Sequence, residues 1–204
     1  MRLFLARHGE TGSQYSERYI GATDLPLSEL GRQQAMQLAD VLPKGVTRCL
    51  CSPLHRARET ASLALRGRDC LLMDMEALRE VDFGRWEGLS FPEIVDQDQA
   101  LVDEWQQNPT SFQFPEGESV EGFRQRVQEG LMTIVALPDK EVLVVCHGGV
   151  IRAMLCALLG LSFANYLSFA IAPAALTVVV VDGHRGVLHG LNLTALASGR
   201  RGES

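Results

Sequence analysis

The chain has 204 residues, of which 46% are hydrophobic and 22% are charged, and its formal net charge is -6. These proportions are typical of a globular domain with a sizeable core, and they exclude a disordered or fibrous chain. The acidic balance argues against a nucleic-acid binder, and a site for an anion must concentrate its positive charge locally. We expect a single domain over residues 1–204.

Five cysteines are scattered along the chain, mostly within apolar runs such as VLVVC. Their odd number and irregular spacing indicate reduced thiols rather than a disulfide framework or a zinc site. The opening MRLFLARHGE and the later AALTVVVVD are too short for a signal peptide or a membrane span. We therefore expect a cytoplasmic protein with no membrane or nucleic-acid partner, and a homodimer is left open.

The first half of the chain predicts two strands, each followed by a helix. Residues 1–7 read as a buried strand that leads directly into the loop HGETG. Ser28 is placed to cap a helix with apolar residues at i, i+3, i+4 and i+7. After the short strand TRCLC (47–51), Ser52 is the expected N-cap of the next helix, and Pro53 takes its first helical position.

The second half continues the alternation and ends in a hairpin. CLLMD (70–74) predicts a strand, and Ser119 is placed to cap a longer amphipathic helix. EVLVVC (141–146) is a near-continuous apolar run, as expected of a parallel strand that is buried on both faces. A helix is expected over 150–160, and two strands joined by a turn follow within 175–193.

This order of elements indicates the fold class. Strands that alternate with helices form a mostly parallel sheet, because each helix carries the chain back to the same edge. We therefore expect an α/β three-layer sandwich, with helices on both faces of a central sheet and an antiparallel C-terminal hairpin.

Two histidines occupy equivalent places in this pattern. His8 and His147 each follow a buried strand directly, and each is followed by a glycine, Gly9 or Gly148. In open α/β sheets, ligands collect at the carboxyl ends of the strands. Both imidazoles are therefore expected to face one crevice, and the glycines permit a close approach of the backbone.

Positive charge gathers at the same edge. Arg7 precedes His8, and Arg56 lies near the start of the helix after TRCLC. Two guanidinium groups can bind several oxygens of one phosphate. Glu80, in LREVDFG, is the candidate proton donor. Other carboxylates compete for that role: Glu76, Asp82, Glu87 and those of PEGESVE.

Four segments occur in an order that resembles one known family. They are RHGET, SPLHRARETA, LREVDFGRWEG and VVCHGG, and together they are similar to the histidine phosphatase superfamily, also called phosphoglycerate mutase-like. The resemblance extends from residue 1 to about residue 160, which is most of the chain.

The resemblance implies a role for each matching residue. His8 would attack phosphorus and become a phosphohistidine, while Arg7, Arg56 and His147 would surround the transferring group. Glu80 would protonate the leaving oxygen and later help to activate water. The residues implied to bind substrate are Gln14, Gly21 and Gly148. Gln14 departs from the pattern, since many members carry an asparagine there.

The implied reaction is the hydrolysis of a small phosphorylated metabolite. A neutral imidazole needs no base before it attacks, and cationic side chains can stabilise the charge on the equatorial oxygens. No carboxylate cluster has metal-ligand spacing, so we expect neither a metal nor a cofactor.

Three alternatives concern the reaction and its substrate. A phosphoglycerate mutase shares the first step, but the short stretch between Glu80 and the helix at Ser119 favours hydrolysis. The segment FPEGESVEGF is similar to α-ribazole-phosphate phosphatases of the cobalamin pathway, although broad-specificity sugar phosphatases share the pattern. A catalytically silent phosphate-binding module is the alternative from another class.

Overall fold

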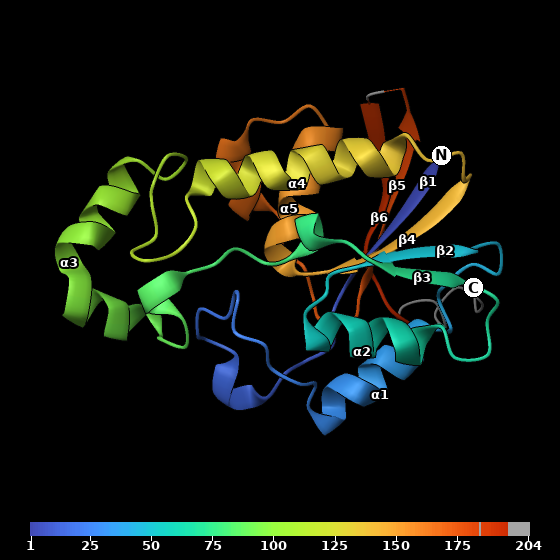
Figure 1. Cartoon of the computed structure of the whole chain (residues 1–204), viewed down its shortest axis with the longest axis horizontal. Coiled ribbons are helices and arrows are strands. Elements are labelled where there is room, and N and C mark those ends of the chain that lie inside the picture. The colour runs from blue at the N-terminus through green and yellow to red at the C-terminus, as the bar shows by residue number, and fades with distance from the viewer. Residues whose placement is uncertain (184, 196–204) are drawn as a thin grey trace, which may run out of the picture.

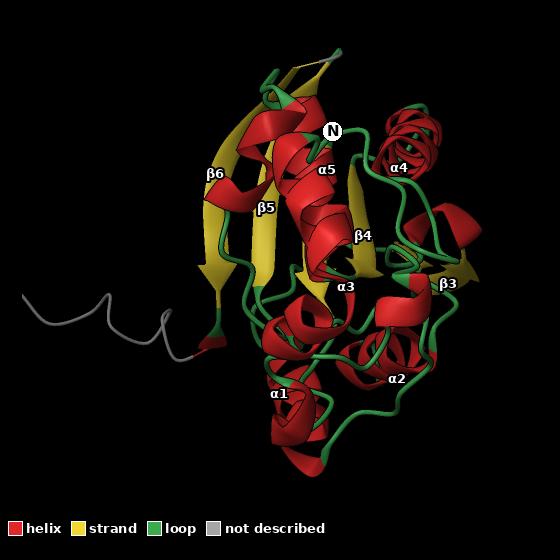
Figure 2. Cartoon of the chain, turned by 90° about the vertical axis from the view of Figure 1, so that its left-hand side faces the viewer, coloured by secondary structure: helices red, strands yellow, loops and turns green. Residues whose placement is uncertain are grey.

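The computed structural model describes residues 1–183 and 185–195, and these form a six-stranded sheet in the order β3-β2-β4-β1-β5-β6. Its strands are β1 (Arg2–Arg7), β2 (Arg48–Cys51), β3 (Leu71–Asp74), β4 (Glu141–Cys146), β5 (Leu176–Asp182) and β6 (Arg185–Leu193). The pairs β3-β2, β2-β4 and β4-β1 are parallel, whereas β5 is antiparallel to both β1 and β6. Figure 2 shows β6 and β3 at opposite sides of the sheet. The predicted fold class, including the C-terminal hairpin, is confirmed.

Helices cover both faces of the sheet. They are α1 (Glu29–Leu38), α2 (His55–Ala64), α3 (Phe91–Gln107), α4 (Val120–Val135) and α5 (Gly148–Leu158). Helices α1 and α2 lie on one face and α4 and α5 on the other, while α3 projects beyond these layers (Figure 1). Within the described part of the chain, no helix is both long and apolar enough to cross a membrane.

The alternation of side chains along β1 explains why both faces are covered. Leu3 and Leu5 belong to the core beneath α4 and α5, whereas Phe4 and Ala6 belong to the core beneath α1 and α2. Successive residues of a strand point to opposite faces, so an unbroken apolar run must be buried from both sides. Strand β1 is therefore packed between two cores, which fix the position of its C-terminal end.

Two of the predicted helix caps are confirmed. The hydroxyls of Ser28 and Ser119 each accept the N–H of the residue three positions further on, at 3.0 and 2.9 Å. These bonds satisfy donors that have no partner inside the helix. Helix α3 kinks at Asp98 (φ -138, ψ 41). The Asp98 carboxylate accepts the indole N–H of Trp86 at 2.8 Å there.

The predicted start of α2 was wrong. The helix begins at His55 with Leu54 as its N-cap, so Ser52 and Pro53 lie outside it. The Ser52 N–H donates to the Val145 carbonyl at 2.9 Å and thus prolongs the ladder beyond β2. Its hydroxyl accepts the Leu54 N–H at 3.4 Å. A serine before a helix satisfies the local backbone here without capping the helix.

Helix α5 begins two residues earlier than expected. His147 is its N-cap, and Gly148 and Gly149 form its first turn. The helix therefore starts immediately at the edge of the sheet, which places backbone N–H groups of α5 beside the two histidines.

Candidate active site

Three strands deliver polar side chains to one edge of the sheet. His8, Ser52 and His147 are the first residues after β1, β2 and β4. The His8 N–H donates to the Cys146 carbonyl at 2.9 Å, which fixes His8 against the end of β4. The imidazole centroids of His8 and His147 are 5.1 Å apart, with their planes at 60°. The two rings therefore lie side by side at the carboxyl ends of the parallel strands.

The His8 ring presents a defined nitrogen. Its Nδ1 lies 2.7 Å from the Gly9 carbonyl oxygen, which can only accept, so Nδ1 carries the proton. Nε2 therefore holds the lone pair, and the Arg56 Nε–H donates to it at 3.3 Å. Burial, with the charges of Arg56 and Arg7, lowers the His8 pKa well below its usual 6.5. His8 is consequently neutral near pH 7 and nucleophilic at Nε2.

Arg56 is held by main-chain oxygens. Its side chain is buried, and Nη1 and Nη2 donate to the carbonyls of Thr23 and Gly21, both at 2.7 Å. Within the described residues no carboxylate forms an ion pair with it. Carbonyl acceptors orient a guanidinium without neutralising it, so its charge stays available to an anion.

The loop that holds Arg56 is organised by Glu87. Its carboxylate accepts the N–H groups of Gly21, Ala22 and Thr23, at 2.8–3.1 Å. A Cβ at Gly21 would lie 1.8 Å from the Val81 carbonyl oxygen, so only glycine fits there. Gly21 therefore contributes to the site through the carbonyl that anchors Arg56.

Arg7 Nε and His147 Nδ1 are buried polar atoms that have no hydrogen-bond partner among the described residues. Other groups of both side chains are engaged, since Arg7 Nη1 donates to the Ile171 carbonyl at 2.6 Å and His147 Nε2 is 2.7 Å from the Ser52 hydroxyl. A buried donor without an acceptor is unfavourable by about 1–3 kcal/mol, and an oxyanion between these residues would satisfy both.

Glu80 combines burial with two backbone donors. Its Oε2 accepts the Gly149 N–H at 2.9 Å and its Oε1 the Val81 N–H at 3.2 Å. Burial raises the Glu80 pKa above its usual 4.5, although these N–H donors and the charges of Arg56 and Arg7 oppose the shift. The net upward shift favours a carboxylic acid that keeps its proton to higher pH than an exposed glutamate.

The other predicted substrate-binding residues differ in position. Gly148 lies beside Arg7, with its Cβ position 3.6 Å from Arg7 Nε. Gln14 is exposed in the 3-10 turn Ser13–Tyr15, and its amide folds over Gly12. No hydrogen bond within the described residues joins Gln14 to the histidines or arginines. The structure thus places Gly148 beside Arg7, and it places Gln14 in an exposed turn.

The carboxylates that competed with Glu80 have other partners. Glu87 is occupied by backbone N–H groups, and Asp82 accepts the Gly84 N–H at 2.8 Å. Glu118, from the PEGESVE segment, pairs with Arg126 at 2.7 Å. No group of three or more His, Cys, Asp or Glu side chains is arranged to hold a metal ion in the described part of the chain.

Sequence reasoning did not assign the observed roles of three residues of the site: Ser52 was expected to cap a helix, Glu87 was named only as a competing proton donor, and Gly149 was given no role. Ser52 could have been found, because it follows a strand as directly as His8 and His147 do. Position 149 requires a glycine because a Cβ there would lie 2.3 Å from Glu80 Oε1. Nothing in the sequence separates Glu87 from the other acidic residues near it.

One edge of the parallel sheet carries a neutral imidazole, a second imidazole and a buried glutamate. It also carries two arginines that form no ion pair with a carboxylate in the part of the chain that the structure describes. Together these groups define a phosphoryl-transfer site. The family comparison agrees with this class. The chain belongs to the histidine phosphatase superfamily (branch 1), whose family model matches residues 3–194.

Individual relatives are phosphatases of different substrates. The chain is 31% identical to the adenosylcobalamin/alpha-ribazole phosphatase of Salmonella typhimurium, over 96% of this chain and 98% of the relative. It is also 31% identical to phosphoserine phosphatase 1 of Hydrogenobacter thermophilus, over 95% and 93%. The crystal structure of the alpha-ribazole phosphatase from Shigella flexneri superposes with a TM-score of 0.84 at 26% identity, covering 95% of this chain and 96% of that one.

Proposed function

We propose that the protein hydrolyses small phosphomonoesters through a phosphohistidine intermediate on His8. The observation that carries this proposal is the state of His8, which is neutral, protonated at Nδ1 and nucleophilic at Nε2. His147 lies 5.1 Å away, and Arg7 and Arg56 contribute charge that carboxylates do not neutralise. Phosphoryl transfer asks for little more than such positioning and charge stabilisation.

In the first step, His8 Nε2 attacks phosphorus and a P–N bond forms as the P–O bond to the leaving group breaks. Glu80 gives its proton to the leaving oxygen, so the alcohol departs neutral. Arg7 Nε and His147 Nδ1, which have no partner within the described part of the chain, would donate to equatorial oxygens of the phosphoryl group. Arg56 adds a third cationic or donor group beside Nε2.

In the second step, water attacks phosphorus and the P–N bond breaks. The Glu80 carboxylate accepts the proton of that water, and inorganic phosphate leaves with His8 neutral again. One residue can act first as acid and then as base because its pKa is raised toward neutrality. This proposal needs no metal ion, since the cationic side chains supply the charge.

The substrate we propose is α-ribazole phosphate. Its support is the Salmonella typhimurium relative, which matches over nearly its whole length, and the Shigella flexneri structure. We also propose a cytoplasmic location, where the five cysteines, all free in the structure, stay reduced.

The test is hydrolysis of p-nitrophenyl phosphate in EDTA, with acid-quench trapping of labelled phosphoenzyme. We expect His8→Ala to lower kcat/KM at least ~10³-fold and to abolish the trapped label, because the nucleophile is gone. His189→Ala, an exposed histidine on β6, is the matched control and should retain both. Undiminished turnover in His8→Ala, or activity only after a metal is added, contradicts the proposal.

A further inference from the structure

An aromatic cavity lies beside the candidate active site. Its volume is about 580 Å³, and its walls include Trp105 of α3, Phe123 of α4, and Tyr166 and Leu167 of the 3-10 helix Phe163–Ser168. This volume is in the range of pockets that hold small organic ligands. Eight of its 16 lining residues are aromatic, and Arg152 is the only charged one among those described.

The inner end of this cavity meets Glu80. Val81, the neighbour of Glu80 in the chain, lines the cavity, and so does Tyr166. A Cβ placed on Gly149 would lie 2.3 Å from Glu80 Oε1 and 2.7 Å from the Tyr166 hydroxyl, so both groups approach one point of the α5 backbone. Arg152, one turn further along α5, lines the same end with its Nε–H bonded to the Phe169 carbonyl at 2.8 Å.

This position places the cavity where the leaving group of the substrate would bind. In the proposed function, the leaving oxygen must reach the Glu80 carboxyl, and whatever is bonded to that oxygen then extends away from phosphorus. The space on that side of Glu80 is bounded by Val81 and Tyr166, which open into the cavity. The groups on phosphorus and the groups on the alcohol are therefore bound by different parts of the site.

The walls favour a flat apolar ring over a small charged group. Phe83 and Phe114 pack edge to face at 5.0 Å, and Tyr19 packs against Phe83 in the same way at 5.1 Å. Such walls present faces and edges on which another ring can stack. The amino and carboxylate groups of phosphoserine would lose water there, with Arg152 as the one charged partner among the described wall residues.

We propose that the protein selects phosphomonoesters whose alcohol carries an aromatic or fused-ring group, and that this ring binds in the cavity of Trp105, Phe123, Tyr166 and Leu167. The inference rests on the proposed function, because it assigns the leaving-group side of that reaction. It excludes phosphoserine and other short polar esters as preferred substrates.

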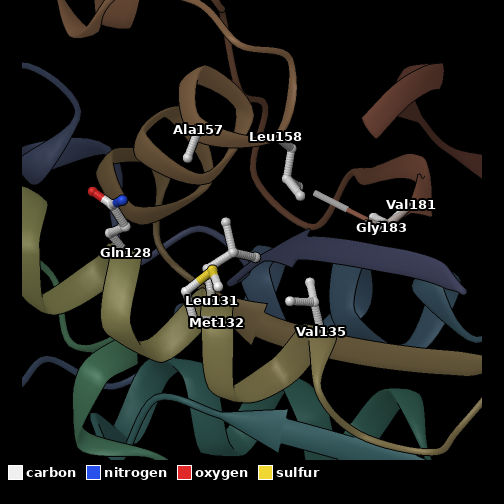
Figure 3. Close-up of a pocket in the computed structure, with 8 residues that line it drawn as sticks. All are labelled: Gln128, Leu131, Met132, Val135, Ala157, Leu158, Val181 and Gly183. Atoms are coloured by element: carbon white, nitrogen blue, oxygen red, sulfur yellow. The ribbon is translucent and has the colours of Figure 1, made fainter. Parts of the chain in front are cut away.

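A second, smaller cavity lies away from the candidate active site. It has a volume of about 270 Å³ and lies between α4, α5 and the end of β5 (Figure 3). Leu131, Val135 and Leu158 line it, and Gln128 is the polar side chain at its edge. It shares no described lining residue with the aromatic cavity and none with the site around His8.

The experiment compares kcat/KM for ethyl, butyl, phenylethyl and naphthylethyl phosphate. These esters release primary alcohols of similar basicity, so differences report binding of the substituent rather than the ease of P–O cleavage. Each buried methylene multiplies kcat/KM by about four, and a fully buried fused ring by about 100 over ethyl. His8→Ala serves in parallel to show that hydrolysis of ethyl phosphate comes from this site.

Leu167→Glu tests whether the cavity is responsible. Leu167 is 77% exposed at the rim, so a glutamate there should be tolerated by the fold while it places a carboxylate beside the ring. We expect the naphthylethyl-to-ethyl ratio to fall about tenfold. Leu71→Glu is the matched control, because Leu71 is 56% exposed and begins β3, away from the carboxyl edge. Its ratio should match that of the unaltered protein.

The outcomes separate the two proposals. A flat series with hydrolysis that depends on His8 overturns the ring preference and leaves the phosphatase proposal standing. A high ratio that Leu167→Glu does not change overturns the assignment to this cavity. Absence of hydrolysis across the series overturns the proposed function and, with it, this inference.

Discussion

The Ser52 hydroxyl is predicted to set the tautomer of His147. Ser52 Oγ lies 2.7 Å from His147 Nε2, and we predict that the Ser52 hydroxyl donates its proton to Nε2. Burial, with the charge of Arg56, lowers the His147 pKa well below 6.5 and keeps the ring neutral. The single ring proton is then on Nδ1, where it can bond to a phosphoryl oxygen. Ser52→Ala removes this constraint.

The size of the effect follows from the burial of His147, which is 0% exposed. Water cannot replace the lost hydroxyl, so the unpartnered nitrogen is unfavourable by about 1–3 kcal/mol. Where that energy is lost from the transition state, kcat/KM falls by about 5- to 150-fold. The assay is steady-state hydrolysis of p-nitrophenyl phosphate, together with urea unfolding to show that the variant is folded at the assay temperature.

Thr177→Val is the control for removing a buried hydroxyl. Thr177 lies on β5, is 1% exposed, and its Oγ1 has no partner among the described residues. Replacing an unsatisfied hydroxyl by a methyl group should leave kcat/KM unchanged and raise the free energy of unfolding by about 1 kcal/mol. If Ser52→Ala turns over as fast as the unaltered enzyme, or if Thr177→Val loses as much activity, the hydroxyl does not act through His147.

Three further predictions concern the ionisable groups. Burial raises the pKa of Glu80, and its acid form is lost as the pH rises through that pKa, so kcat/KM should fall on the alkaline side of its pH profile. In Glu80→Gln, with p-nitrophenyl phosphate as the substrate, this alkaline fall should disappear and the maximum of kcat/KM should be lower by about 10²–10³-fold. Burial lowers the pKa of His147 in the folded protein, so below pH 6.5 the unfolded chain binds a proton at this histidine that the folded protein does not. The free energy of unfolding should therefore decrease as the pH falls below 6.5. In His147→Gln the slope of unfolding free energy between about pH 6 and 5 should drop by about 1 kcal/mol per pH unit, and an unchanged slope in urea titrations would contradict this. Glu87→Gln replaces a carboxylate with two acceptor oxygens by an amide with one, so the loop whose carbonyls hold Arg56 loses hydrogen bonds. Calorimetry should then show that phosphate binds about tenfold more weakly, and an unaltered affinity would contradict this prediction.

The location of the histidines could be predicted because local signals agreed there. An apolar run followed by a glycine loop marks the end of a buried strand, and parallel strands end at one edge. His8 and His147 are far apart in the chain, yet the sheet order alone brings them together. The same signals predicted two of the serine helix caps, Ser28 and Ser119.

The start of α2 could not be predicted, because a distant interaction overrides the local rule. Ser52 followed by Pro53 satisfies every local criterion for a helix start, yet the Ser52 hydroxyl is bound to a histidine 95 residues away. Glu80 was named as the proton donor, but the residues themselves left Glu87 as a competitor, because both are glutamates in one segment. Packing distinguishes them, since Glu80 accepts the Gly149 N–H and Glu87 accepts the N–H groups of a loop.

An acidic chain can concentrate positive charge for a phosphate because Arg7 and Arg56 form no ion pair with a carboxylate among the described residues. Several other arginines are paired with carboxylates, as Arg48 is with Asp139 at 2.9 Å. At the site, Arg7 and Arg56 are oriented by carbonyl oxygens, which carry no net charge to oppose an anion. Burial and the same two charges lower the pKa of His8, so the arrangement that would attract a phosphate also keeps the proposed nucleophile unprotonated. Binding and activation are therefore consequences of one electrostatic arrangement, and any substitution that pairs Arg56 with a carboxylate should weaken both together.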